Sequence, residues 1–376
     1  MIKTYTLSVL RFLGALAGTL TRDVRGAGAS VLGFVETWLL DAKHAQYGLA
    51  VTRILLGVTG VGLLLTNFST RLYVFGSGSA WNGEAAEPTS DFPKIWLFSL
   101  FHRIAQNDTL FTLAYLVLLV LAVLVVLGWR MKLVLPVYFI GWVSFIEVND
   151  MVGDQGDNMY RITLMTLLFA DTARRWSLDS RRRAKADLPR TAPRSLPDRL
   201  RWVWAGERYA PEWLTNVLHN LALVVITCHV CFVYASGALY KASGEPWQQG
   251  YAIYNPLHVD RFSPWPGLAD VLTAWAPAVA LISWASIIIQ MGFPMMLANR
   301  ITRIIALFGI LAFHVGIAVL MGLPWFSLAM IAIDAIFIRD VTWQQVSQRV
   351  GDAWARARPP QQRPRPAKAA EKELVR

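Results

Sequence analysis

Long runs of apolar residues alternate with shorter polar segments over most of the chain. Each run approaches the roughly 20 residues that an α-helix needs to cross the hydrocarbon core of a bilayer. The pattern predicts an all-α fold, a polytopic transmembrane bundle of about eight spans. The expected spans are Leu49–Phe68, Thr109–Gly128, Leu133–Val148, Met159–Ala170, Val217–Tyr240, Val271–Leu297, Ile304–Leu323 and Trp325–Ile338.

The two ends of the chain differ from this pattern. The stretch Thr6–Leu20 is interrupted by an arginine and is not typical of a cleavable signal. Apolar residues at helical spacing over Val31–Leu40 predict that residues 1–47 form an interfacial amphipathic segment. Residues 48–340 would form the transmembrane domain. Residues 341–376 are basic and contain several prolines, which predicts a disordered tail.

Positive charge is concentrated in alternate connections between the expected spans. The basic segments are the turn at Arg130 and Lys132, the long linker 174–210, the turn 300–303 and the C-terminal tail. The intervening connections contain few lysines or arginines. Because loops rich in these residues remain on the cytoplasmic side, this alternation predicts that both termini and the linker are cytoplasmic.

Composition supports a membrane location, which we expect to be the cell (inner) membrane. The chain is 55% hydrophobic and only 16% charged, whereas soluble domains are roughly 25% charged. The net charge of +11 lies in loops and tails. It therefore indicates attraction to anionic lipids, with the bilayer as partner, and not nucleic-acid binding.

Several function classes lack their motifs. The sequence contains no phosphate-binding loop, G-x-S-x-G elbow or H-E-x-x-H segment, which argues against ATP-driven pumps and common hydrolases. Its two cysteines, Cys228 and Cys231, exclude a disulfide scaffold. They are either a redox pair or packing residues. No metal site is expected, because zinc would lack enough ligands in one place.

An acidic segment, Gly153-Asp-Gln-Gly-Asp-Asn158, precedes the fourth expected span on its outer side. Asp154 and Asp157 are three residues apart and share a face if the segment is helical. Together with Asn158 they are candidates for orienting a base, binding a substrate or accepting a proton. The alternative is that they only cap the helix.

Lys241 lies at the outer end of the fifth expected span, followed by Trp247. One interpretation is a lysine that extends toward the membrane surface beside an interfacial tryptophan. The other is an amine partly removed from water, which is a usable base.

Polar residues also occur in the middle of spans. His229 and His314 lie at mid-depth on different helices, and Gln290 lies in the sixth span. Because polar groups are costly inside a bilayer, each is a candidate for proton relay or ligand binding. Each is equally compatible with a hydrogen bond between neighbouring helices.

Three stretches resemble the HTTM (horizontally transferred transmembrane) domain family, which includes vitamin K-dependent gamma-glutamyl carboxylases and SdpB-like bacterial membrane proteins. The first is Phe169-Ala-Asp followed by Trp176-Ser-Leu-Asp179. The second runs from Tyr234 through Gly237 and Lys241 to Trp247-Gln-Gln-Gly250. The third begins at Phe313-His314 and continues to Phe326. Their order and spacing extend the resemblance over residues 45–340.

The resemblance implies a carboxylase-like activity. In the carboxylases, a lysine in the Gly…Lys segment is the base that deprotonates reduced vitamin K, and Lys241 is the matching position. The intramembrane histidine of the family matches His314. A reduced quinone is the implied cofactor, and a peptide is the implied substrate.

The sequence departs from the carboxylases in three places. Their Asn-His pair is replaced by the stretch Asp154–Asn158, which has no histidine, and Gln290 occupies a helix in which glutamate is common. Only a short tail follows the last expected span, in place of the large soluble domain of the carboxylases. A smaller substrate or a partner subunit is therefore expected.

Two hypotheses follow. In the first, the chain is an enzyme with Lys241, His314 and Asp157 as catalytic residues. Its substrate would be bound by Asp154, Asn158, His229, Tyr234, Trp247 and Gln290. In the second, the bundle has a non-enzymatic role in peptide maturation, immunity, or lipid or quinone binding.

Overall fold

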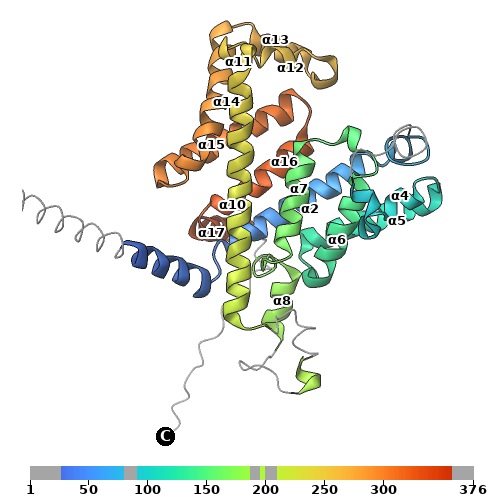
Figure 1. Cartoon of the computed structure of the whole chain (residues 1–376), viewed down its shortest axis with the longest axis vertical. Coiled ribbons are helices and arrows are strands. Elements are labelled where there is room, and N and C mark those ends of the chain that lie inside the picture. Colours follow the sequence, from blue (N-terminus) through green and yellow to red (C-terminus); the bar gives the residue numbers. More distant parts are fainter. Residues whose placement is uncertain (1–26, 80–90, 187–194, 200–209, 358–376) are drawn as a thin grey trace, which may run out of the picture.

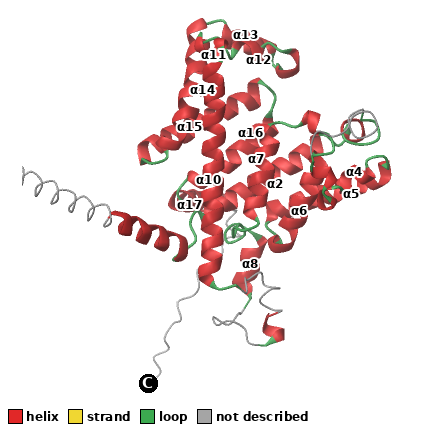
Figure 2. Cartoon of the chain, viewed as in Figure 1, coloured by secondary structure: helices red, strands yellow, loops and turns green. Residues whose placement is uncertain are grey.

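A computed structural model describes residues 27–79, 91–186, 195–199 and 210–357, and all regular structure within these ranges is helical (Figure 2). The expected all-α class is therefore confirmed for this part of the chain. The stretch Thr6–Leu20, much of the linker 174–210 and residues 358–376 lie outside the described residues.

Every expected span coincides with helical structure. The helices are α2 (Gln46–Thr66), α5 (Asp108–Leu127), α6 (Met131–Ile146), α7 (Gln155–Leu167), α10 (Glu212–Ser243), α13 (Pro266–Thr273), α14 (Ala276–Met296), α15 (Arg300–Leu320), α16 (Pro324–Asp334) and the 3-10 turn η5 (Ala335–Phe337). Within the described ranges, five of them are long and apolar enough to cross a membrane, namely α2, α5, α10, α14 and α15. The chain is thus a helical membrane protein, and α6 and α16 are shorter apolar helices.

The remaining helices are short, apart from α17 (Asp340–Ala357). They are α3 (Arg71–Val74), η1 (Phe92–Lys94), η2 (Trp96–Phe98), α4 (Leu100–Ile104), η3 (Asp150–Val152), α8 (Leu178–Lys185), α11 (Glu245–Gln248), α12 (Tyr254–Leu257) and η4 (Asp260–Phe262). A further helix covers Ala27–Leu40, and it includes the stretch Val31–Leu40 that was expected to be helical.

The sixth expected span, Val271–Leu297, is divided into two helices. α13 ends at Thr273, and α14 begins at Ala276 with a proline in its first turn. Proline lacks a backbone N–H and its ring clashes with the carbonyl group four residues earlier, so it fits only in the first turn of a helix. The apolar run therefore breaks before Pro277, and α13 belongs to the group of short helices at one end of α14 (Figure 1).

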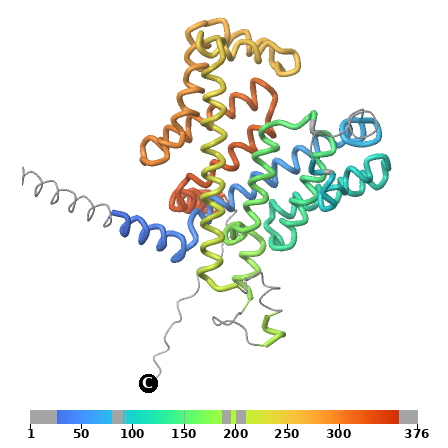
Figure 3. Tube along the Cα trace, in the orientation of Figure 1, coloured from blue at the N-terminus to red at the C-terminus, as the bar shows by residue number. Residues whose placement is uncertain are grey.

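α16 joins two groups of helices. It packs against α15 on one side and against α2 and α7 on the other. α10, α14 and α15 form the first group, while α2, α5, α6 and α7 form the second (Figures 1 and 3). The polar side chains of the candidate functional site lie in and beside this junction.

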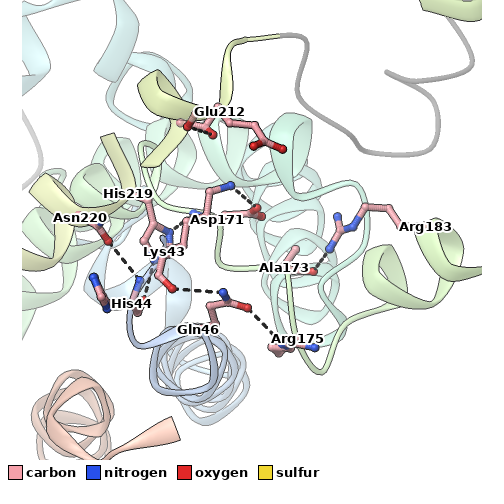
Figure 4. A network of polar contacts seen from close by, with 11 residues as sticks. Lys43, His44, Gln46, Asp171, Ala173, Arg175, Arg183, Glu212, His219 and Asn220 are labelled. Atoms are coloured by element: carbon pink, nitrogen blue, oxygen red, sulfur yellow. Dashed lines mark hydrogen bonds and ion pairs between the residues drawn. The ribbon is translucent and has the colours of Figure 1, made fainter. Parts of the chain in front are cut away.

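A polar joint connects the N-terminal part of α10 to the segment before α2 (Figure 4). The Asn220 amide, which is fully buried, donates to the carbonyl oxygens of Trp38, Leu39 and Ala42. These are carbonyls at and after the end of helix Ala27–Leu40, which lack partners within the helix. His219 Nε2 lies 2.7 Å from the His44 carbonyl oxygen. The Asn220 side chain on α10 therefore supplies hydrogen-bond donors to the C-terminal end of the helix Ala27–Leu40.

The Trp-Ser-x-Asp segment forms a second joint. The Asp179 carboxylate accepts from the backbone N–H groups of Arg130 (2.8 Å) and Met131 (2.9 Å), at the start of α6. Arg130 adopts a left-handed backbone and its own side chain makes no capping bond, so Asp179 supplies the cap. The Trp176 carbonyl accepts from the buried guanidinium of Arg53, at 2.7 Å. This segment of the family resemblance thus has a structural function here.

α17 corrects the expectation that a disordered tail begins at residue 341. The helix continues to Ala357, with Val346, Val350 and Trp354 spaced four residues apart along it. Its first residue, Asp340, accepts from the backbone N–H groups of Gln46 and Tyr47, both at 3.0 Å. Residues 358–376 are rich in proline and arginine, and their composition masks the apolar spacing of residues 340–357 in the average over the whole tail.

Candidate functional site

The Lys241 amine lies among side chains from three other helices. Its Nζ atom donates to the Gln290 side-chain oxygen on α14 at 2.7 Å. It also lies 4.9 Å from the centre of the Phe313 ring on α15 and 5.4 Å from that of Trp247 on α11. Rings at these distances attract a cation through their π faces. The side chain is half-buried, and its contacts favour the interpretation of a partly desolvated amine.

The partner of this amine is neutral. Gln290 is buried, and its carbonyl oxygen accepts a hydrogen bond without contributing negative charge. Among the described residues, no carboxylate forms an ion pair with Lys241. The protonated amine therefore lacks the charge compensation that a glutamate at this position would give.

A second set of polar groups lies beside the amine. The Tyr234 hydroxyl on α10 donates to Asp334 Oδ2 on α16 at 2.7 Å, and His314 Nε2 on α15 lies 3.4 Å from the same hydroxyl. All three side chains are buried. His314 follows Phe313, whose ring contacts the amine. We refer to these five residues, Tyr234, Lys241, Gln290, His314 and Asp334, as the lysine cluster.

Two buried atoms of the lysine cluster have no hydrogen-bond partner among the described residues. They are His314 Nδ1 and Asp334 Oδ1. Because buried polar atoms are nearly always paired, these two are available to a bound molecule. The cluster therefore combines an amine able to accept a proton with further groups able to orient a polar ligand.

Asp334 is the member of the cluster that is not among the expected site residues. It lies at the end of the short helix α16, and its carboxylate is brought to Tyr234 by the packing of α16 on α10. The signal was present, because an acidic residue within an apolar helix is a candidate by its cost alone. The sequence did not show which helix α16 packs against.

His229 lies apart from the lysine cluster. It is on α10, five residues before Tyr234, which corresponds to about 140° around the helix axis. Its Nε2 atom is buried and has no partner in the described part of the chain. The nearby Cys231 is partly buried and packs against the apolar core, and both cysteines are free thiols.

Asp154 and Asp157 form a capping box at the start of α7. Asp154 Oδ1 accepts from the N–H groups of Gly156 (2.6 Å) and Asp157 (3.2 Å). Asp157 Oδ2 accepts from the Asp154 N–H at 3.0 Å. The capping interpretation is therefore confirmed. Asn158 accepts from the Arg161 guanidinium, which also forms an ion pair with Glu147.

Phe326 lies between the capping box and the lysine cluster. Its ring centre is 5.8 Å from that of His314, and its atoms also lie close to Gly156, which belongs to the first turn of α7. Within the described residues, no hydrogen bond or ion pair connects Asp154 or Asp157 to the cluster. The polar residues expected to form one site are thus not joined by hydrogen bonds or ion pairs into a single group in the described part of the chain.

The capping box predicts a pH-dependent stability. Burial, and then the neighbouring Asp154 carboxylate and Glu147, raise the pKa of Asp157 from 3.8 to about 6. The hydrogen bond with the Asp154 backbone N–H and the charge of Arg161 act in the opposite direction. The folded protein therefore holds this proton more tightly than the unfolded chain. The stabilisation is complete below pH 3.8 and is lost as the pH rises through about 6.

Asp157→Asn keeps an acceptor oxygen and cannot ionise. We expect its thermal midpoint in detergent, relative to the wild type, to be higher at about pH 7 than at about pH 4. Asp260→Asn, at an exposed position, is the control and should show no such difference. An equal effect of Asp157→Asn at both pH values would contradict the prediction.

Comparison with known proteins identifies the C-terminal part of the chain. Residues 206–343 match the model of the HTTM domain family. The match contains α10 to α16 and all five residues of the lysine cluster, and it confirms the resemblance for this part of the chain. The Trp176–Asp179 segment lies outside the matched residues. No curated protein and no solved structure matches the chain.

Proposed function

We propose that this HTTM-domain protein is an enzyme of the bacterial inner membrane, in which Lys241 takes a proton from the hydroxyl group of a reduced quinone. The observation that carries the proposal is the environment of the amine. It is hydrogen-bonded to the neutral Gln290, flanked by aromatic rings and unpaired with any carboxylate of the described residues. Such an amine is a better base than a lysine in an ion pair.

The order of the helices supports an outward-facing site. Asp340, which follows α16, binds the start of α2, and Trp325 Nε1, at the start of α16, donates to Thr66 at the end of α2. α2 and α16 therefore run in opposite directions, as the charge alternation predicts. Lys241 is near the end of α10 that leads into the connection poor in lysine and arginine. By the positive-inside rule this end is outside, and both termini are cytoplasmic.

The surrounding groups fit a ring that carries hydroxyl or carbonyl oxygens. Phe313 and Trp247 provide aromatic surface beside the amine. His314 Nδ1 and Asp334 Oδ1 provide the unpaired buried polar atoms that such oxygens can bind. In a carboxylase-like reaction, a bound hydroquinone would supply, with oxygen, the strong base for carboxylation. The acceptor would be a small substrate or a peptide held by a partner.

Gln290→Glu tests the role assigned to the neutral partner. A carboxylate here would form an ion pair with Lys241 and hold the amine in its protonated form. We expect oxygen uptake driven by a reduced quinone to fall by about tenfold or more, and the remaining activity to move to higher pH. The measurement is oxygen consumption by the purified protein over a range of pH.

The matched control is Gln248→Glu, which introduces the same charge at an exposed position of α11 close to the site. It should leave both the rate and its pH profile unchanged. Wild-type protein that consumes no oxygen with any reduced quinone would refute the proposed function. An unchanged profile in Gln290→Glu would refute the role of Gln290.

A further inference from the structure

A cavity of ≈ 190 Å³ lies between the ends of α2, α6, α7 and α16, on the other side of Phe326 from the lysine cluster. It is large enough for a small organic group, since a single water needs only about 15 Å³. Its walls include Trp142, Tyr160, Trp325 and Phe326, together with Asp154 and Asp157. Aromatic side chains and carboxylates thus line the same pocket.

Each carboxylate has an oxygen that the capping box does not use. The box employs Oδ1 of Asp154 and Oδ2 of Asp157, and in the described part of the chain the other two oxygens accept no hydrogen bond. The nearby cation, Arg161, is bonded to Glu147 and Asn158. The acidic edge of the cavity therefore keeps negative charge that is not neutralised by an ion pair to either aspartate.

Trp142, which also lines the cavity, carries an unpaired hydrogen-bond donor among the described residues. Its side chain is 1% exposed, and its Nε1 atom has no hydrogen-bond partner among the described residues. The indole is held against Tyr160, with ring centres 4.6 Å apart. An indole nitrogen can only donate, so its missing partner must be an acceptor.

We propose that this cavity binds a ligand carrying an ammonium group and, close to it, an oxygen acceptor. The carboxylates and the aromatic faces attract the ammonium group. The acceptor oxygen would take the hydrogen bond of Trp142. A phosphoethanolamine headgroup has both parts, and so does a free amino alcohol. The cavity lies near the expected outer membrane surface, where either can reach it.

The test is a binding titration of the full-length protein in detergent, followed by native mass spectrometry. The probes are short-chain phosphatidylethanolamine, the matching phosphatidylglycerol, which lacks the amine, and free ethanolamine. Binding of phosphatidylethanolamine in preference to phosphatidylglycerol would assign a lipid headgroup. Binding of ethanolamine without either lipid would assign a small-molecule amine. Both outcomes support the proposal, whereas equal binding of the two lipids or no binding of any amine would overturn it.

Two substitutions test whether the Asp157 carboxylate and the Trp142 N–H group bind the ligand. Asp157→Asn should weaken amine binding by about tenfold or more, because it removes a charged hydrogen bond, while asparagine can still accept the backbone bond. Trp142→Phe keeps the aromatic ring and removes only the N–H, with an expected loss of about three- to tenfold. Trp275→Phe, at an exposed position before α14, is the control. Wild-type affinity in both Asp157→Asn and Trp142→Phe would also overturn the proposal.

Discussion

Replacing Lys241 by alanine is expected to lower quinone-dependent oxygen uptake by about 100-fold or more, the usual contribution of a positioned general base. Lys241 is the only residue of the lysine cluster whose side chain is an amine, and no other lysine of the described residues contacts Gln290. The rate should be measured at saturating reduced quinone, so that weaker binding does not mimic a lost base.

The substitution Lys241→Arg distinguishes a role of this side chain as a base from a role as a positive charge. Arginine keeps a positive charge and several donors for Gln290, yet it does not lose its proton in proteins. It should therefore be about as inactive as the alanine variant while retaining the thermal midpoint of the wild type more closely. An active Lys241→Arg protein would show that the position supplies charge and not a base. Full cellular function of Lys241→Ala would favour the non-enzymatic hypothesis.

The positions of the helices could be predicted because apolar length is a local property of the sequence. The expected spans at Thr109–Gly128 and Ile304–Leu323 agree closely with α5 and α15. The break before Pro277 and the helix α17 were not predicted. In both cases the local signal is weaker than the average composition around it. Pro277 lies within a long apolar run, and the apolar residues of α17 precede a basic, proline-rich segment.

The lysine cluster could be predicted only in part. Lys241, Gln290 and His314 were selected because each is costly in an apolar helix, and the structure brings them together with Tyr234. Topology alone placed Asp157 on the same side of the membrane as Lys241. It could not show that the Phe326 side chain lies between them, because which side chain separates two residues depends on how the helices pack.

Tyr234→Phe is expected to destabilise the protein by about 3 kcal/mol, because it leaves a buried polar group without its partner. Asp334 is 8% exposed, and its Oδ1 atom already has no partner among the described residues. The Tyr234 hydroxyl, 2.7 Å from Oδ2, is its hydrogen-bond donor. Without that hydroxyl, neither carboxylate oxygen would be satisfied within the bundle.

Thermal unfolding in detergent measures the effect, and a second substitution identifies its cause. Tyr234→Phe combined with Asp334→Leu removes both polar groups and should recover much of the loss, since replacing both partners by apolar groups can be nearly neutral. Tyr240→Phe, at an exposed position on the same helix, is the control and should retain the wild-type midpoint. If the double variant is no more stable than Tyr234→Phe, the loss does not come from the unpaired Asp334. In that case the hydroxyl stabilises the packing of α10 against α15 through its contact with His314, 3.4 Å away.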